Sequence, residues 1–399
     1  MRPDQSKALL SRLAVLSACC LILAGCVTTQ LRNPYTVEEL ITSSVSERND
    51  LRFFPARESD VQAALDWSGE QGNAPPPAEG GRFDVLALSA GGPDGAFGAG
   101  ALSGMQKAGN RPQYEVVTGA STGAVIAPFA FLGPRYDNFI TSMYRDNVLG
   151  KLLGRPNYLA AISGPSLYSG KAIFDFLDEQ VTPQLLAEIA TEHAKGRRLL
   201  ITTANLDANQ LTVWDMGRIA SIGTPQARQL FRSIMRASFS IPGALPPVEI
   251  KGQSGGKQFT ELHGDAGLLA YFYADPALVP PAYRKRGGQA SRPRIDIILH
   301  NQIEAKPEPV EAKTLTLAGK SISNLTRTSM RLLLDESIRN AADNKIALRY
   351  TYLPIEWRTV SSVDFEAEYL RDTWQLGYQR ALNGTLWHEG PRKPAGPAG

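Results

Sequence analysis

The sequence contains few cysteines and histidines, and this scarcity excludes several kinds of site. Its 399 residues include three cysteines and four histidines. All three cysteines, Cys19, Cys20 and Cys26, lie within the first 26 residues. A mature chain that begins at Cys26 would therefore form no internal disulfide. The histidines and carboxylates show no spacing typical of metal ligands, so we expect neither a metal nor another cofactor.

The sequence also has little excess of charge of either sign. Its formal net charge is +3, of which the first 25 residues contribute +2 through Arg2, Lys7 and Arg12 against Asp4. A chain with so little net charge is not expected to bind nucleic acid. The composition, 43% hydrophobic and 20% charged, is that of a globular protein, and it leaves the oligomeric state open.

The N-terminus lacks an apolar run long enough to span a bilayer, but it carries a targeting pattern. Lys7 and Arg12 precede the short apolar stretch Leu13 to Ala24. The stretch ends in Leu23-Ala24-Gly25-Cys26, which resembles the lipobox of bacterial lipoproteins. The resemblance implies that residues 1–25 are a signal peptide and that Cys26 is acylated and anchors the chain to a membrane. An uncleaved anchor and an ordinary secretory signal are the alternatives.

The residue after Cys26 bears on the destination of the chain. Val27 follows the cysteine where an Asp would favour a different membrane. By resemblance to Gram-negative lipoproteins, we expect a lipid-anchored protein of the bacterial cell envelope, at the outer membrane and facing the periplasm. Two or three acyl chains would make this anchor stable.

The chain divides into four parts by composition. After the signal peptide, residues 26–81 form an N-terminal tether or linker segment, with a short helix expected at 58–67 and a Pro- and Gly-rich linker at 72–81. The part before this linker either tethers the chain or packs against its core. Residues 82–388 form the main domain, and residues 389–399, rich in Pro and Gly, form a disordered tail.

The main domain alternates between apolar strands and helical patterns. This alternation predicts an α/β domain with a mainly parallel central sheet covered by helices. Strands are expected at 84–88, 115–118, 198–206, 210–214, 296–300 and 346–352, and helices at 95–107, 122–131, 322–340 and 364–381.

A serine stands at a strand-to-helix junction. Gly119-Ala120-Ser121-Thr122-Gly123 matches the G-x-S-x-G pattern of a nucleophile elbow, directly after an apolar run. Gly119 and Gly123 lack side chains that would keep the strand and the helix apart. The sharp turn between them would expose the hydroxyl of Ser121 to a substrate carbonyl. An ordinary glycine-rich βα turn is the alternative.

A second glycine-rich turn precedes the elbow. Ala90-Gly91-Gly92-Pro93-Asp94-Gly95 follows a strand and opens a helix. Because glycine has no side chain, a carbonyl oxygen of a substrate can reach the backbone N–H groups of this turn and accept hydrogen bonds from them. The N-terminus of the following helix adds partial positive charge at the same place. A phosphate-binding loop is the competing interpretation, but the spacing matches neither the P-loop nor the full dinucleotide pattern.

The base that would activate Ser121 is less obvious. His193 and His388 are expected at the surface, and His300 in the core or at its rim. Asp265 lies close to His263 in a turn between glycines, where an Asp is often only a turn former.

Four motifs in one order resemble the patatin-like phospholipases, over roughly residues 83–269. They are the glycine-rich loop at 90–95, the elbow around Ser121, the block at 236–248 (Arg-Ala-Ser-Phe-Ser-Ile-Pro-Gly-Ala-Leu-Pro-Pro-Val) and Asp265-Ala266-Gly267. The resemblance implies a three-layer α/β/α patatin-like fold. It also implies a Ser–Asp dyad without histidine, in which Ser121 is the nucleophile and Asp265 the base.

The resemblance further implies how the site works. The N–H groups of Gly91 and Gly92, with Thr122, would hold the oxyanion, and Gly95 would complete the loop. The substrate would be an acyl ester of a (phospho)lipid. The sequence departs from the family pattern at Ala90, Asp94 and Ala266. Asp94 stands where the family usually has a basic residue, and its carboxylate is expected to cap the helix that follows.

Three other functions stay open at this point. Asp94 weakens the case for a phospholipid more than the case for ester hydrolysis, so a general carboxylesterase or an acyltransferase is one alternative. A non-catalytic envelope lipoprotein that serves as a scaffold is another. A Ser-His-Asp hydrolase is the third, because His300 follows Ser121 and Asp265 in the chain order that such enzymes use.

Overall fold

The computed structural model describes residues 34–65, 81–158, 164–285, 292–307 and 309–392. Cys26, almost all of the expected linker at 72–81 and residues 393–399 lie outside these ranges.

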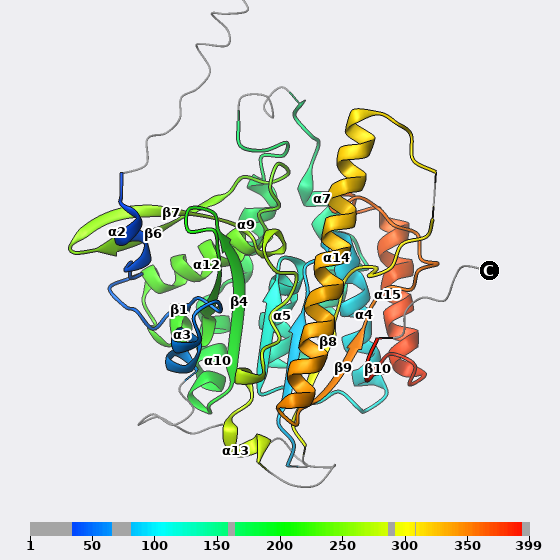
Figure 1. Cartoon of the computed structure of the whole chain (residues 1–399), viewed down its shortest axis with the longest axis horizontal. Coiled ribbons are helices and arrows are strands. Elements are labelled where there is room, and N and C mark those ends of the chain that lie inside the picture. Colours follow the sequence, from blue (N-terminus) through cyan, green and yellow to red (C-terminus); the bar gives the residue numbers. More distant parts are fainter. Residues whose placement is uncertain (1–33, 66–80, 159–163, 286–291, 308, 393–399) are drawn as a thin grey trace, which may run out of the picture.

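One sheet of ten strands runs through the molecule (Figure 1). Its order is β1-β5-β4-β3-β2-β8-β9-β10, and β7 also pairs with β4 and carries β6 at its other edge. The five central strands, from β4 to β9 in this order, are parallel, and the remaining pairs are antiparallel. This arrangement confirms the expected mainly parallel sheet. The strands are β1 Arg52–Phe53, β2 Asp84–Leu88, β3 Val116–Ala120, β4 Arg198–Asn205, β5 Gln210–Asp215, β6 Val248–Ser254, β7 Lys257–Asp265, β8 Arg294–Ile298, β9 Ala347–Thr351 and β10 His388–Glu389.

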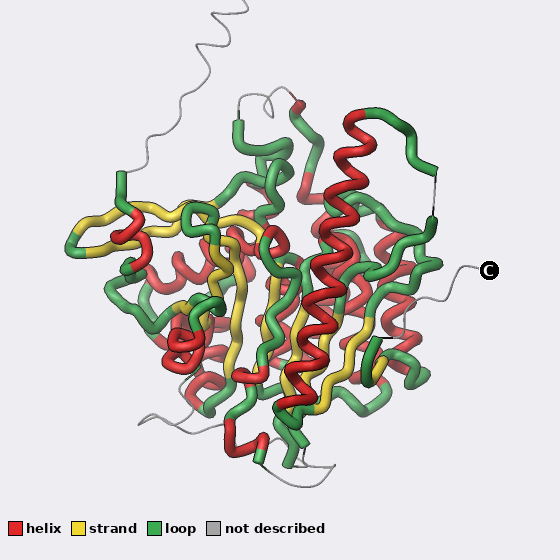
Figure 2. Tube along the Cα trace, viewed as in Figure 1, coloured by secondary structure: helices red, strands yellow, loops and turns green. Residues whose placement is uncertain are grey.

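Helices cover both faces of the sheet and make the fold a three-layer α/β/α arrangement (Figures 1 and 2). The larger core lies under α4 Gly95–Lys107, α5 Thr122–Leu132, α6 Asp137–Tyr144, α7 Val148–Leu153, α9 Lys171–Gln180, α10 Pro183–Ala194, α11 Met216–Ser221, α12 Pro225–Phe239 and α15 Ala367–Leu382. The smaller core lies under α3 Glu58–Ala64, α13 Pro281–Arg284 and α14 Thr314–Asp343.

Side chains of the central strands alternate between these two cores. In β2, Leu86 and Leu88 enter the larger core, whereas Val85 and Ala87 enter the smaller one. Successive residues of a strand point to opposite faces, so a strand buried on both faces must be apolar throughout. This explains why the central strands appear in the sequence as continuous apolar runs.

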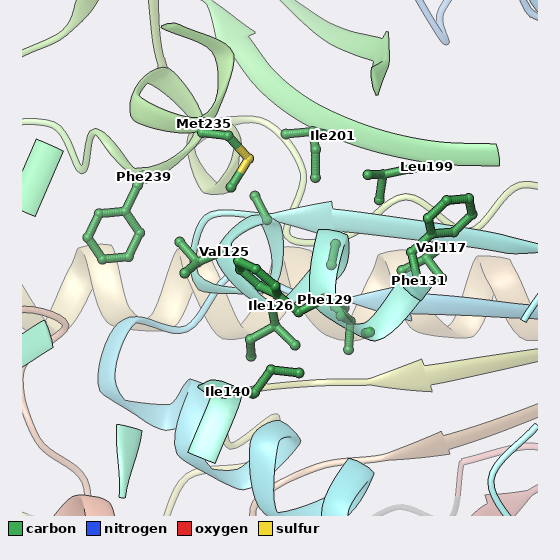
Figure 3. Packing of buried hydrophobic residues seen from close by; sticks show 14 of the residues in the cluster. Val117, Val125, Ile126, Phe129, Phe131, Ile140, Leu199, Ile201, Met235 and Phe239 are labelled. Carbon is green, nitrogen blue, oxygen red and sulfur yellow. The ribbon is translucent and has the colours of Figure 1, made fainter. Parts of the chain in front are cut away.

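The helix that follows the elbow, α5, is buried almost all round. Ten of its eleven residues are buried. Figure 3 shows Val125, Ile126 and Phe129 of α5 among side chains of β4, α6 and α12. A helix that is apolar on every side belongs inside a protein. Its N-terminus, and Ser121 before it, are therefore held by packing from several directions.

The N-terminal segment packs against the sheet. β1 pairs with β5, and α2 Val37–Ile41 lies against β6. Arg52 of β1 makes a buried ion pair with Glu261 of β7, with 2.6 Å between Nη1 and Oε2. Burial raises the pKa of Glu261, but the hydrogen bonds from Arg52 and His263 outweigh it and keep the pKa below its ordinary value. The described part of this segment, residues 34–65, is thus joined to the main fold.

Several elements differ from the sequence-based expectation. α14 begins eight residues earlier than expected, at Thr314, because its first turns are exposed and carry no core-facing apolar period. Glu389, expected in a disordered tail, belongs to β10, which pairs with β9. No helix among the described residues is long and apolar enough to cross a bilayer.

Candidate active site

Ser121 lies at the turn between β3 and α5 in a strained backbone conformation. Its φ is 53°, in a region that non-glycine residues rarely occupy. The flanking glycines are required by close approach: a Cβ on Gly119 would lie 2.6 Å from the carbonyl oxygen of Gly123. A Cβ on Gly123 would lie 2.3 Å from the carbonyl oxygen of Leu88. The spacing of the motif therefore has the steric origin expected from the sequence.

The hydroxyl of Ser121 donates a hydrogen bond to Oδ2 of Asp265, 144 residues further along the chain. Asp265 is the last residue of β7, and its own N–H donates to the carbonyl oxygen of Ser240. Its other carboxylate oxygen, Oδ1, accepts the N–H of Gly267 at 2.7 Å. Both carboxylate oxygens are thus fixed, with Oδ2 directed at Ser121.

Burial changes the acidity of this carboxyl group. Ser121 is 2% exposed and Asp265 5% exposed. Burial raises the pKa of Asp265 to about 6, although the hydrogen bonds from Ser121 and Gly267 act in the opposite direction. A carboxylate with this pKa is a better base than an exposed one and is still mostly ionised at neutral pH.

The glycine-rich loop at 90–95 lies next to Ser121 and Asp265, since its Ala90 packs against Ala120 and Ala266. Gly91 lies against His300, where a Cβ would come within 2.0 Å of the His300 carbonyl oxygen. Gly92 has a φ of +56° and lies against Ser362, whose carbonyl oxygen would be 2.3 Å from a Cβ. No described residue accepts a hydrogen bond from the N–H groups of Gly91 or Gly92. These two donors are therefore available to an anionic oxygen.

Three of the four motifs meet in one small cluster. Ala90 of the glycine-rich loop, Ala120 of the elbow and Ala266 of the Asp265 turn pack together and are at most 4% exposed. Larger side chains at these positions would separate the loop, the elbow and the Asp265 turn. Ala90 and Ala266, two of the departures from the family pattern, thus fit the site sterically.

Gly95 and Thr122 join the loop to the elbow. A Cβ on Gly95 would lie 2.3 Å from Oγ1 of Thr122. The Thr122 hydroxyl is paired with that of Tyr144 on α6. The side chain of Thr122 is thus held away from Ser121, and its backbone N–H is left at the N-terminus of α5, where N–H groups lack helical partners.

His300 does not reach Ser121 or Asp265. Its Nδ1–H donates to the carbonyl oxygen of Ser89 at 2.6 Å, and its backbone N–H donates to Oγ of Ser89 at 2.8 Å. Its Nε2 is buried without a hydrogen-bond partner and faces Gly98 of α4. Burial lowers its pKa to about 4. The structure therefore does not have the His300–Ser121 contact that a Ser-His-Asp triad needs. His300 instead binds Ser89 and packs against Gly91 of the glycine-rich loop.

The other histidines also have structural partners. His263 is buried in β7 between Thr203 and Glu261. His193, expected at the surface, is mostly buried, with its Nδ1 3.6 Å from Oδ1 of Asp215. His388, also expected at the surface, is half-buried in β10 and stacks on Tyr350. In the part of the chain that is described, no three His, Cys, Asp or Glu side chains are grouped to hold a metal ion.

Asp94 does not cap α4 as expected. Its side chain makes no capping hydrogen bond and instead accepts the hydroxyl of Tyr369, from α15, at 2.5 Å. Burial raises the pKa of Asp94 to about 7, although the hydrogen bond from Tyr369 lowers it. The expectation failed because the sequence does not reveal that α15 packs beside α4.

Two serines at this site had no role assigned from the sequence. Oγ of Ser238, at the end of α12, accepts the backbone N–H of Ser121 at 3.0 Å. The carbonyl oxygen of Ser240 accepts the N–H of Asp265. Both lie inside the motif at 236–248, so the motif was the signal that could have identified them. This block connects the two members of the Ser121–Asp265 pair.

The chain was compared with solved structures, curated proteins and protein-family models. The crystal structure of VipD from Legionella pneumophila is similar with a TM-score of 0.36 and 10% sequence identity, over 78% of this chain and 69% of that one. No curated protein matches the chain. The family model described as patatin-like phospholipase matches residues 86–278, which include the glycine-rich loop, Ser121, the 236–248 block and Asp265. The chain is therefore a lipid acyl hydrolase with a patatin-like phospholipase domain at residues 86–278.

Proposed function

We propose that the protein cleaves acyl esters of membrane lipids through a Ser121–Asp265 dyad. The observation that carries this proposal is the hydrogen bond from the Ser121 hydroxyl to Asp265 in a buried site, beside the unpaired N–H groups of Gly91 and Gly92. A nucleophile, a base and oxyanion donors are the three components that acyl transfer needs.

The proposed reaction has two steps. Oγ of Ser121 attacks the acyl carbonyl carbon while Asp265 accepts its proton, and the N–H groups of Gly91, Gly92 and Thr122 hold the oxyanion. Asp265 then gives the proton to the leaving alcohol, and an acyl-enzyme remains. Asp265 next takes a proton from water, whose oxygen attacks the acyl carbon, and it returns this proton to Oγ of Ser121 as the bond between Oγ and the acyl carbon breaks and the fatty acid leaves. Gly119, Gly123 and Gly95 position the reacting backbone.

Membrane attachment is part of the proposal. Acylation of Cys26 would place the enzyme at the outer membrane, next to its lipid substrate. The described fold begins at residue 34, so seven residues, 27–33, lie between it and Cys26. Fully extended, the chain from Cys26 to residue 34 spans about 28 Å. An enzyme tethered at this distance remains within reach of the bilayer surface.

One observation favours a second candidate, a general carboxylesterase or acyltransferase. Asp94 lies where the family usually has a basic residue, and it pairs with Tyr369. The site therefore lacks a positive side chain at this position that would attract a lipid phosphate. Hydrolysis of short esters without hydrolysis of phospholipid would support this candidate.

Turnover by matched variants tests the dyad. We expect Ser121→Ala and Asp265→Asn each to lower kcat/KM on p-nitrophenyl esters and phospholipid vesicles by at least about 10²-fold. Asp275→Asn is the control, because Asp275 accepts the N–H of Ala277 at 2.7 Å just as Asp265 accepts that of Gly267. It should retain wild-type activity.

The same experiment can contradict the proposal. Equal activity of Asp265→Asn and Asp275→Asn would exclude Asp265 as the base. A wild-type protein that neither turns over any ester nor reacts with a fluorophosphonate at Ser121 would instead support a scaffold.

A further inference from the structure

Large apolar side chains are exposed in two segments beside the candidate active site. We call these six side chains the apolar rim. Each is between 43 and 71% exposed, a wide exposure for residues of this kind. The rim consists of Leu268, Leu269, Leu317, Ile322, Leu325 and Leu332.

The four α14 residues of the rim include a stripe that faces away from the protein. Met330 and Leu334 face the smaller core and are fully buried. Leu325 and Leu332, seven residues apart, lie on the opposite side of the helix, and Ile322, three residues before Leu325, lies beside them between that side and the core-facing one. α14 therefore has one apolar side that packs on the sheet and another that no described residue covers.

The N-terminal half of α14 extends beyond the sheet at the edge where the candidate site lies. α14 has 30 residues and spans about 45 Å, whereas a five-residue strand spans about 17 Å. β9 starts directly after α14 and runs parallel to the other central strands, through β8 and β2 to β3. The carboxyl ends of β2 and β3 therefore lie toward the start of α14, which overhangs them (Figure 1).

Contacts connect the rim to Asp265. Leu268 and Leu269 follow Asp265 by three and four residues. Tyr271, two residues further, lies close enough to Thr326 of α14 and to Asp265 for both side chains to act on its pKa, which burial above all raises. The rim is thus continuous with the surroundings of the proposed base.

The charge along α14 points to an anionic partner. Residues 313–334 contain four basic residues and no acidic one. Lys320, Arg327 and Arg331 are spaced by seven and four residues and share one flank of the helix. At the ends of the segment, Glu311 pairs with Lys313 and Asp335 with Arg392, whereas Glu336, one turn after Leu332, is an exposed acidic residue. An exposed apolar stripe with a cationic flank is typical of helices that lie in a membrane interface.

We propose that the apolar rim docks on an anionic lipid bilayer, with Ile322, Leu325 and Leu332 entering the interface and Lys320, Arg327 and Arg331 near the headgroups. A second copy of the chain is the other occupant that an apolar surface could take. Two copies joined through this face would bring their cationic flanks together, whereas anionic lipids neutralise them. Docking at the rim would bring the candidate active site to the bilayer that holds its substrate. This consequence rests on the proposed lipid hydrolase function, whereas the docking itself does not require turnover.

A fluorescent probe on α14 tests the docking directly. The described residues contain no cysteine, so replacing Cys19, Cys20 and Cys26 by Ser in the full chain frees it of thiols. An environment-sensitive dye is then attached to Leu325→Cys, or to Leu382→Cys on α15 as the control, since Leu382 is an exposed leucine outside the rim. Both proteins also carry Ser121→Ala, so that the lipid stays intact.

On vesicles of phosphatidylcholine with about one third phosphatidylglycerol, we expect a blue shift and quenching by spin-labelled lipid at position 325 and not at 382. Equal exposure of both probes to water would overturn the proposal. A blue shift at 325 without vesicles would also overturn it and would indicate a second copy of the chain.

Hydrolysis by an otherwise unmodified full chain supplies the second arm. Ile322→Ser/Leu325→Ser/Leu332→Ser should lower the rate on these vesicles by about tenfold or more and leave the rate on a soluble p-nitrophenyl ester unchanged. Val37→Ser/Leu382→Ser, which changes exposed apolar residues elsewhere, should change neither rate. If the wild type cleaved no ester, the proposed function would fail, while the probe at 325 would still decide whether the rim docks.

Discussion

The pKa of Asp265 makes a quantitative prediction about the pH dependence of the reaction. Asp265 must be ionised to accept the proton of Ser121. With burial raising its pKa to about 6, about half of the free enzyme is competent at pH 6, about one tenth at pH 5 and about one hundredth at pH 4. A carboxyl group at the ordinary value of 3.8 would still be more than about nine tenths ionised at pH 5. The two cases differ by about tenfold in activity at pH 5.

The assay is kcat/KM for a soluble p-nitrophenyl ester, because this ratio reports ionisations of the free enzyme. We expect an acid limb centred near pH 6, below which kcat/KM falls tenfold for each pH unit. Circular dichroism at each pH would verify that the protein stays folded over the range. A kcat/KM that stays constant down to about pH 4.5 would refute the assignment of Asp265 as a buried base.

Asp94 is the second buried carboxyl group near the oxyanion loop, and it provides the control. Burial raises its pKa to about 7, so its ionisation could also produce a limb in this range. We expect Asp94→Asn to leave the limb near pH 6 in place. A limb near pH 7 that disappears in Asp94→Asn would instead assign the pH dependence to Asp94.

The ionisation of Asp265 is expected to raise activity but to lower the free energy of unfolding. Its pKa is higher in the folded than in the unfolded protein, so the folded state favours the protonated form. The stabilising contribution is therefore complete below about pH 3.8 and is lost as the pH rises through about 6. The difference between the two pKa values corresponds to about 3 kcal/mol. Urea unfolding of wild type and Asp265→Asn at several pH values would measure this contribution.

Three further substitutions probe the surroundings of the dyad. Gly92→Ala places a Cβ 2.3 Å from the Ser362 carbonyl oxygen at a φ of +56°, so the loop must shift; we expect kcat to fall by about 10²–10³-fold in a protein that remains folded by circular dichroism. Arg52→Ala leaves Glu261 buried without its cation, and urea unfolding should show a loss of about 3–5 kcal/mol, whereas a loss below about 1 kcal/mol would contradict a buried pair. His300→Phe removes the donor to the loop and should lower stability by about 1–3 kcal/mol and kcat moderately, with the acid limb unchanged in the pH profile of kcat/KM. Complete loss of activity in folded His300→Phe would revive the Ser-His-Asp mechanism.

The sequence alone predicted the local parts of the fold. The strand predicted at 84–88 has the predicted bounds, and the one predicted at 296–300 lies two residues earlier, at Arg294–Ile298; both were recognisable because a strand buried on both faces is apolar over most of its length. The glycines around Ser121 predicted a tight strand-to-helix turn, since their requirement arises within five residues. The order of four motifs identified the family. That Ser121 and Asp265 act as a catalytic dyad stays a prediction that the variants above would test.

Other features depended on segments that meet only in the folded chain. Asp94 was expected to cap α4, but Tyr369 from α15 takes its carboxylate. His300 comes after Ser121 and Asp265 in the chain, as the histidine of a triad would, yet its side chain binds Ser89, directly before the glycine-rich loop. Nothing near Arg52 in the sequence indicates that it would pair with Glu261, more than two hundred residues away.

The physical reason for this division is the range of the interactions. Backbone conformation at a glycine or within an apolar strand is set by neighbouring residues and by whether the segment is buried. Burial, hydrogen-bond partners and therefore pKa values are set by what packs around a side chain, and those atoms come from distant parts of the chain. Residue types could thus identify Asp265 as a candidate base, but only the tertiary structure decided that it lies buried against Ser121, with its pKa raised to about 6.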